Sequence, residues 1–300
     1  MHLSVRRGVC NILQHFLSLT PIYILRIFQY CYVITFCWGV RIDFHIDGFR
    51  RYAADYRLFS AGRAVAGNLV GGVVAMIELD HLVAGYEGLA ITPSLSGTIE
   101  TGSMTAIVGL NGCGKSTLLK TLAGFIPPVS GRLNWRDGRP IIGWLAQRHS
   151  LESQFPLTVQ DVVSQGAWPR VSLLRGVRGE IRQRISTALE RVGLLAMAKT
   201  PIEELSGGQF QRMLFARVMI QRAPLVMLDE PFTGIDEATS RDLMTLILEM
   251  HQQGQTILAV LHDNQRVAEH FPETLLLTSQ HARWGETPGV LSAFNSARLA

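Results

Sequence analysis

The sequence contains little cysteine, and its few cysteines form no pairing pattern. Only four occur in 300 residues, and none belongs to a CxxC pair or to a Cys/His spacing that would hold a metal ion. Small secreted proteins that depend on disulfide bonds carry many more cysteines. The sequence therefore predicts neither a disulfide framework nor a zinc knuckle, and it favours a reducing, cytosolic compartment.

Charged residues are also scarce and are unevenly distributed. They make up 17% of the chain, against 47% for apolar residues, which is the composition of a globular protein and not of a disordered one. Residues 1–75 contain eight arginines, three aspartates and no lysine, so their net charge is +5, and residues 76–300 carry the remaining −1. Because the basic excess lies in the first quarter, the main part of the chain shows no sign of binding nucleic acid.

The first quarter also lacks an uninterrupted apolar run. Residues 22–40 are apolar and aromatic but include Arg26 and Gln29, whereas a membrane-spanning helix needs about 20 largely uncharged residues. A central arginine costs about 2.5 to 3.5 kcal/mol on insertion scales, although snorkelling reduces that cost. A membrane span, an interfacial helix and a secretory signal are the alternatives for this segment.

We expect residues 1–75 to be an N-terminal extension that is non-native or poorly ordered, translated upstream of a true start at Met76. Gly67 to Ala75 is rich in small residues without a period, whereas apolar and polar residues partly alternate from Ile77 to Val83, as in a strand. The expected domain organisation is therefore an extension over 1–75 and a folded domain over 76–300.

A glycine-rich motif follows a short apolar run at Met104 to Val108. Residues 109–116 read GLNGCGKS, which fits GxxxxGK[ST]. Glycines let such a loop curl so that its N–H groups point at phosphate oxygens, and a helix predicted from Thr117 to Ala123 adds its positive end. Lys115 is expected to reach the β and γ phosphates, and the Ser116 hydroxyl to bind Mg²⁺. The other expected phosphate contacts are Gly109, Asn111, Gly112, Cys113, Gly114 and Thr117.

Two acidic residues end a second apolar run. Leu225 to Leu228 reads as a buried parallel strand, and Asp229 and Glu230 follow it directly. At the carboxyl end of such a strand, Asp229 is placed to hold Mg²⁺ through water, and Glu230 to polarise an attacking water.

The segment that decides among nucleotide-binding families is Leu205-Ser206-Gly207-Gly208-Gln209, followed by Gln211-Arg212 and a helical pattern to Ile220. It resembles the signature motif of ABC ATPases. Its two glycines leave the backbone open to phosphate at a helix N-terminus, so Ser206, Gly207, Gly208 and Gln209 are expected nucleotide contacts.

Four further residues match the same family in chain order. Tyr86 is similar to the aromatic residue that stacks on adenine, and Gln147 to the glutamine that senses Mg²⁺ and the γ phosphate. Asp236 resembles the aspartate of the dimer contact. His262, after a strand predicted from Thr256 to Val260, resembles the switch histidine at the γ phosphate.

The resemblance implies an α/β P-loop fold with a parallel core sheet, an antiparallel β subdomain from about Ile77 to Gly97 and a helical subdomain at about 148–204. It also implies ATP hydrolysis with Mg²⁺, with catalysis by Glu230, His262, Lys115 and Gln147 and metal binding by Ser116, Gln147 and Asp229. Two subunits, identical or not, are expected to meet head to tail at the cytoplasmic face of the membrane. The implied partners are an integral membrane permease and a substrate-binding protein, without nucleic acid.

The expected cargo class comes from short patterns, two in the helical subdomain that meets the permease in this family and one after the two acids. Phe155-Pro156-Leu157-Thr158-Val159, Asp161-Val162-Val163 and the run from Phe232 to Asp236 are similar to zinc and manganese importers. Iron-chelate importers are the alternative. Soluble ABC ATPases of ribosomes or chromosomes are a further one, but the chain has a single cassette and no heptad run.

Overall fold

The structure is a computed structural model that describes residues 74–146, 157–167 and 179–299. The extension expected over residues 1–75 therefore lies almost wholly outside the described residues, as does Gln147. The first strand begins at Ala75, one residue before the expected boundary, and the carbonyl of Val74 accepts a hydrogen bond from Thr101 N–H at 2.8 Å.

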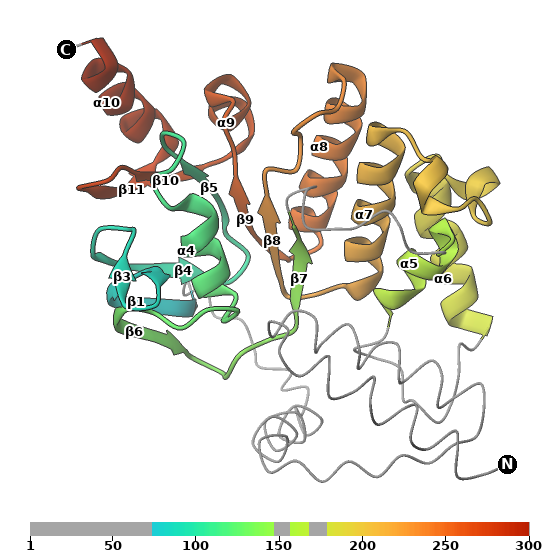
Figure 1. Cartoon of the computed structure of the whole chain (residues 1–300), viewed down its shortest axis with the longest axis horizontal. Coiled ribbons are helices and arrows are strands. Elements are labelled where there is room, and N and C mark those ends of the chain that lie inside the picture. The colour runs from blue at the N-terminus through green and yellow to red at the C-terminus, as the bar shows by residue number, and fades with distance from the viewer. Residues whose placement is uncertain (1–73, 147–156, 168–178, 300) are drawn as a thin grey trace, which may run out of the picture. The chain divides into compact units, whose positions relative to one another are not determined.

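In the part of the chain that the structure describes, five strands come first, and helices and strands alternate strictly from residue 207 to residue 277 (Figure 1). The strands are β1 (Ala75–Val83), β2 (Gly85–Tyr86), β3 (Leu89–Ala90), β4 (Leu95–Glu100), β5 (Met104–Val108), β6 (Ser130–Trp135), β7 (Ile142–Leu145), β8 (Leu225–Asp229), β9 (Thr256–Val260), β10 (Glu273–Leu277) and β11 (Ala282–Glu286). The α-helices are α4 (Lys115–Leu122), α5 (Val159–Gln165), α6 (Gly179–Arg191), α7 (Gly207–Gln221), α8 (Glu237–Gln252), α9 (Asn264–His270) and α10 (Thr287–Leu299), and two short 3₁₀ helices are η4 (Leu195–Met197) and η5 (Ile202–Glu204).

The central sheet has six strands in the order β11-β10-β5-β9-β8-β7. All neighbouring strands run parallel except the pair β10–β11 at one edge. β5, β8 and β9 are buried at every residue, as strands covered on both faces must be. The parallel core predicted from the sequence is confirmed.

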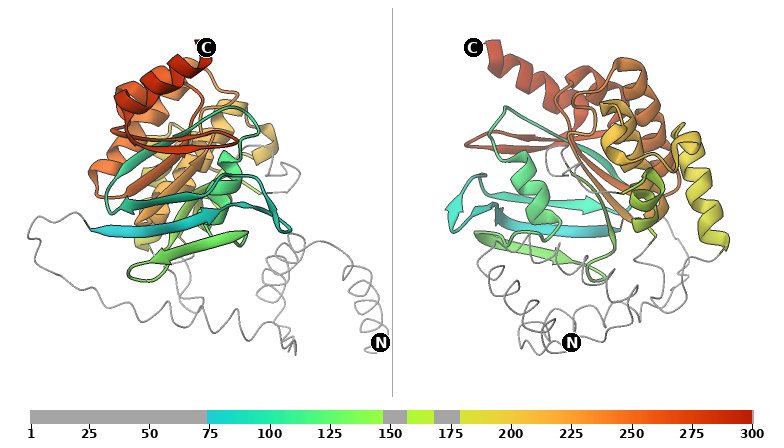
Figure 2. Two further views of the ribbon diagram at one scale, coloured as in Figure 1. Left: turned by 90° about the vertical axis from the view of Figure 1, so that its left-hand side faces the viewer. Right: turned by 45° about the vertical axis from the view of Figure 1, so that its right-hand side comes forward.

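Side chains alternate between two hydrophobic cores on opposite faces of this sheet. On β8, Val226 and Leu228 pack with α7 and α8, whereas Leu225 and Met227 pack with α4. The second core continues from α4 into the three-stranded sheet, so α4 lies between the two sheets (Figure 2). Because successive side chains of a strand point to opposite faces, each central strand contributes to both hydrophobic cores.

The antiparallel subdomain is larger than the predicted Ile77 to Gly97. Its sheet has the order β4-β1-β6, so β6, at 130–135, completes it from beyond the phosphate loop. The sequence did not predict β6, because most of its side chains are exposed and it lacks an apolar run. β6 forms a strand because its backbone pairs with that of β1.

Helices α5 and α6 lie between β7 and α7 in the chain and pack against α7 (Figure 1). Within the helical subdomain, the sequence predicts helices near Val159 to Gln165 and Glu180 to Val192, and α5 and α6 match them. Thr158 begins α5 with a capping box, because its hydroxyl accepts from Asp161 N–H at 3.3 Å and Asp161 Oδ2 accepts from Thr158 N–H at 3.0 Å. Residues 147–156 and 168–178 of this region lie outside the described residues.

Candidate active site

Sheet order brings the functional segments to one edge of the central sheet. β9 lies between β5 and β8, so the phosphate loop, the two acids and His262 all follow the carboxyl ends of adjacent parallel strands. This is the edge at which parallel α/β sheets bind ligands.

The phosphate loop requires glycine at three positions. Gly109, Gly112 and Gly114 have φ angles of 153°, 81° and 96°. A Cβ at Gly109 would lie 2.0 Å from the carbonyl oxygen of Leu277, so a side chain there would also clash with backbone. Gly114 is the N-cap of α4, which places Lys115 and Ser116 in the first helical turn, two residues earlier than predicted.

Lys115 is buried beneath the loop, with 5% of its surface exposed. Its Nζ donates hydrogen bonds to the carbonyl oxygens of Gly109 at 3.0 Å and Leu110 at 2.9 Å. The ammonium group is therefore held across the concave side of the loop, close to the N-terminus of α4. Both features attract phosphate oxygens.

Ser116 and Asp229 form an oxygen pair between α4 and the end of β8. The Ser116 hydroxyl donates to Asp229 Oδ1 at 2.8 Å, and Asp229 is 2% exposed. Burial raises the pKa of the Asp229 carboxyl and the negative Glu230 raises it further, whereas the Ser116 bond and the charges of Lys120 and Lys115 lower it. A poorly solvated carboxylate beside a hydroxyl suits Mg²⁺, which prefers oxygen ligands, so these residues fit the metal.

Glu230 and His262 meet although they follow different strands. His262 Nε2 lies 2.7 Å from Glu230 Oε1, and the Glu230 side chain is 16% exposed. Glu230 has a left-handed φ of 51°, and its N–H donates to the Val260 carbonyl at 3.3 Å. Such a backbone conformation is unfavourable for a residue with a side chain, so the surrounding contacts hold the carboxylate in this direction.

Thr233 is a contact that the sequence reasoning did not assign. Its hydroxyl donates to Glu230 Oε2 at 3.3 Å, so both carboxylate oxygens of Glu230 have partners. A hydroxyl three residues after an acid can reach back across a turn, and the N–H of Thr233 also donates to the Glu230 carbonyl. In the sequence, the spacing of three residues between Glu230 and Thr233 was the signal from which this contact could have been predicted.

The signature segment begins α7 with a capping box. Ser206 Oγ accepts from Gln209 N–H at 3.3 Å, and Gln209 Oε1 accepts from Ser206 N–H at 2.8 Å. A Cβ at Gly208 would lie 3.6 Å from Thr239 Oγ1 and 3.8 Å from Asp236 Oδ2. The start of α7 therefore lies beside the start of α8.

Two further contacts fix this region. Gln211, which is buried, donates from Nε2 to the Pro231 carbonyl at 2.7 Å, which links α7 to the residue after Glu230. Asp236 caps α8, accepting from Thr239 N–H at 2.9 Å and from its hydroxyl at 2.8 Å. These two bonds, the backbone one first, lower the pKa of the Asp236 carboxyl.

The structure thus brings Lys115, Ser116, Asp229, Glu230 and His262 together beside the other phosphate-loop residues, whereas Ser206–Gln209 are at the start of α7. Among the hydrogen bonds and ion pairs of the described residues, none joins Ser206–Gln209 to the phosphate loop. Tyr86 lies on β2 and is 42% exposed.

Comparison with known proteins decides the family. A family profile described as ABC transporter matches residues 93–233. The manganese transport system ATP-binding protein MntB of Bacillus subtilis is 37% identical over 224 residues, which are 73% of this chain and 90% of that protein. The chain belongs to the ABC transporter ATP-binding family. It is an ABC ATPase, the subunit of a transporter that binds and hydrolyses ATP.

Two further similar proteins also belong to transport systems. The zinc transport system ATP-binding protein TroB of Treponema pallidum is 38% identical over 225 residues, covering 73% of this chain and 83% of that protein. A solved ABC transporter in an inward-facing conformation superimposes with a TM-score of 0.65 at 30% identity, over 72% of this chain and 85% of that one. In the described parts of the ABC ATPase, no helix has both the length and the apolar character needed to cross a membrane.

Proposed function

We propose that Lys115, Ser116, Asp229, Glu230 and His262 carry out ATP hydrolysis in this subunit. The observation behind the proposal is their convergence at one sheet edge, with Ser116 bonded to Asp229 and Glu230 to His262. Phosphoryl transfer to water depends on positioning and charge neutralisation. Lys115 binds the β and γ phosphates, Glu230 orients the attacking water, and His262 contacts the γ phosphate while holding Glu230.

Mg²⁺ belongs to this proposal as the cofactor of ATP. Ser116 and Asp229 would hold it, and when bound it neutralises charge on the β and γ phosphate oxygens. Gln147 remains an expected ligand and sensor, although it lies outside the described residues.

The complete site is proposed to form between two subunits arranged head to tail. The phosphate loop of one subunit, with Asn111, Cys113 and Thr117, binds ATP together with Ser206, Gly207, Gly208 and Gln209 of the other, and Tyr86 stacks on adenine. The proposal is supported by the position of Ser206–Gln209 at the N-terminus of α7, where, among the described residues, no hydrogen bond joins them to the phosphate loop of their own subunit. Asp236, which lies beside Gly208, is proposed to take part in the subunit contact.

Substitution of Lys115 tests the proposed phosphate site. Lys115→Ala should abolish ATP binding and hydrolysis, because it removes the buried ammonium at the loop. Lys199→Ala is a matched control, since Lys199 is exposed outside the site, and it should retain both. Normal hydrolysis in a folded Lys115→Ala protein would exclude the proposed site.

The proposed cargo is manganese or zinc, taken up through a permease with a substrate-binding protein at the cytoplasmic face of the membrane. Its support is the similarity to the MntB and TroB proteins and the short patterns at 155–159 and 232–236. The test is uptake of labelled Mn²⁺, Zn²⁺ and ferric chelates by cells that carry this gene with the neighbouring permease gene. Uptake of ferric chelate alone, lost with Glu230→Gln, would assign the chain to the iron-chelate alternative.

Residues 74–300, which add Val74 and Ala75 to the predicted domain 76–300, are proposed to suffice for the ATPase, with residues 1–73 dispensable. Val74 and Ala75 pair with Thr101 and Glu100, so a shortened chain should start no later than Val74 to keep the first strand whole. Hydrolysis by a chain starting at Val74 should equal that of the full chain. Intact-mass analysis of the protein expressed from its own gene tests whether the extension is present.

A further inference from the structure

Arg266 lies on α9, the helix that starts two residues after His262. Asp263 caps this helix, because its Oδ1 accepts from Gln265 N–H at 2.9 Å and from Arg266 N–H at 3.2 Å. The position of Arg266 is therefore fixed relative to the residue that directly follows His262.

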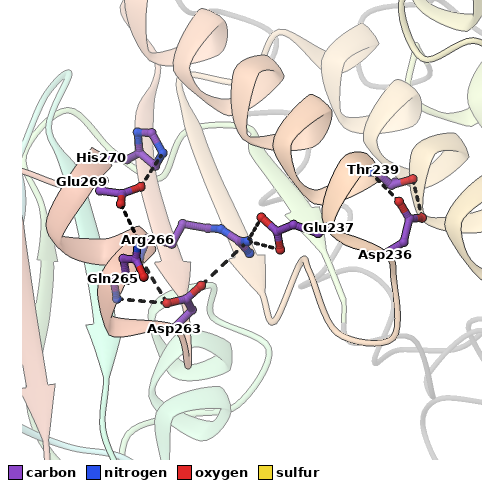
Figure 3. Close-up of polar contacts among 8 residues, drawn as sticks. All are labelled: Asp236, Glu237, Thr239, Asp263, Gln265, Arg266, Glu269 and His270. Carbon is purple, nitrogen blue, oxygen red and sulfur yellow. Dashed lines mark hydrogen bonds and ion pairs between the residues drawn. The ribbon is translucent and has the colours of Figure 1, made fainter.

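The guanidinium group of Arg266 reaches a second segment, at the start of α8. Its Nη2 donates to both carboxylate oxygens of Glu237, at 3.2 Å and 3.1 Å, and lies 3.8 Å from Asp263 Oδ2 (Figure 3). Its Cζ lies 4.6 Å from the centroid of the Phe232 ring. The Arg266 side chain is 13% exposed, although that of Glu237 is 68% exposed.

These partners stand at the two ends of one connecting segment. Phe232 follows Glu230 by two residues, and Glu237 follows Asp236 directly and begins α8. Arg266 thus joins both ends of the segment 232–237 to the turn that carries His262. Nothing in the hydrolytic roles described above uses this arginine.

We propose that Arg266 is a positioning residue for ATP hydrolysis, which keeps the segment after Glu230 and the turn after β9 in the arrangement where His262 contacts Glu230. The inference rests on the proposed roles of Glu230 and His262. A guanidinium suits this task because it is planar, so one face covers an aromatic ring while its edge donates to carboxylates. A lysine ammonium keeps the charge but does not reproduce both contacts.

The experiment measures ATP hydrolysis, nucleotide affinity and thermal stability of the full chain at concentrations where hydrolysis per subunit has reached its maximum. Arg266→Gln should lower kcat about 10-fold and leave KM and nucleotide affinity within about twofold, because misplaced reacting groups slow the chemical step and not binding. Arg266→Lys should recover part of the loss. Arg283→Gln, on the exposed side of β11, is the matched control and should behave as the wild type.

Glu237→Gln provides a second variant whose folding is not at risk, because its side chain is largely exposed. It should lower kcat by about threefold. The double variant with Arg266→Gln should be no slower than Arg266→Gln alone, because both substitutions act on the same contact between Arg266 and Glu237. Unchanged kcat in Arg266→Gln, fully additive losses in the double variant, or a loss of kcat matched by lost nucleotide affinity and stability would each overturn the inference.

Two reference variants separate this inference from the proposed function. If Glu230→Gln or His262→Ala hydrolyses ATP at the wild-type rate, the proposed site itself is wrong. If both are inactive while the Arg266 variants are normal, only the role of Arg266 is refuted.

Discussion

His262 Nε2 lies 2.7 Å from Glu230 Oε1, although the two residues are 32 positions apart in the chain. β8 and β9 are adjacent and parallel, and the N–H of Glu230 donates to the carbonyl of Val260, so the residues after the two strands share one edge. The contact joins the residue proposed to orient water to the residue proposed to contact the γ phosphate.

Removal of the Glu230 charge should stop hydrolysis without preventing ATP binding. Glu230→Gln keeps the size of the side chain and its contact with His262 but cannot polarise water as a carboxylate does. We expect a loss of kcat of at least about 100-fold, with ATP retained, in a steady-state assay paired with a nucleotide-binding assay. Glu269→Gln, on the exposed side of α9, is the control, and turnover by Glu230→Gln near the wild-type rate would contradict the assigned role.

The two-subunit site predicts that hydrolysis depends on protein concentration. The rate per subunit should rise steeply as the chain is concentrated or combined with its permease, because the proposed site takes its phosphate loop from one subunit and Ser206–Gln209 from the other. Ser206→Arg and Gly207→Asp should abolish this activity in the folded protein. A rate per subunit that stays constant over a wide dilution series would show that one subunit is sufficient.

Burial of Asp229 predicts a gain in stability when its charge is removed. Because burial raises the pKa of the carboxyl, the native state binds this proton more tightly than the unfolded chain does, and the contribution of Asp229 to the free energy of unfolding falls as pH rises through the raised pKa. Asp229→Asn should therefore raise the Tm at neutral pH while it abolishes hydrolysis. The gain should shrink as the pH is lowered toward the ordinary range of an aspartate, and thermal unfolding without nucleotide over a pH series measures it.

Loss of the Gln211 amide should destabilise the native protein. Gln211 is 3% exposed and donates to the Pro231 carbonyl at 2.7 Å, so Gln211→Leu leaves a buried acceptor without that donor. We expect a loss of roughly 1 to 3 kcal/mol in the free energy of unfolding, measured in urea. Gln265→Ala breaks an exposed bond to Glu269 and should change it by less than about 0.5 kcal/mol.

The elements predicted from the sequence are those whose signals are local. β5, β8 and β9 appear as short apolar runs because both faces of each strand are buried. The phosphate loop is recognisable because its glycines adopt left-handed backbone conformations that other residues rarely adopt. Local patterns also predicted α5 and α6, within one residue at each end.

The elements that the sequence did not predict depend on distant partners. β6 has mostly exposed side chains and becomes a strand because its backbone pairs with β1, some fifty positions earlier in the chain. The helix after the phosphate loop begins at Lys115 and not at Thr117, because Gly114 in its left-handed conformation is the N-cap. β6 could not be predicted because an exposed edge strand has no alternation of apolar residues. The start of α4 could not be predicted because it depends on the conformation of Gly114 alone.

The sequence by itself determined the chemistry of this protein: a glycine loop with Lys115 and Ser116, two acids after an apolar strand, and the signature segment at Ser206. Each of these depends on residue type and neighbouring positions along the chain. Only the tertiary structure decided that Ser116 bonds to Asp229, that Glu230 meets His262, and that Arg266 joins Phe232 and Glu237 to the turn after β9. These contacts follow from the strand order β5-β9-β8, which is selected by burial of both sheet faces over the whole domain and not by any single segment.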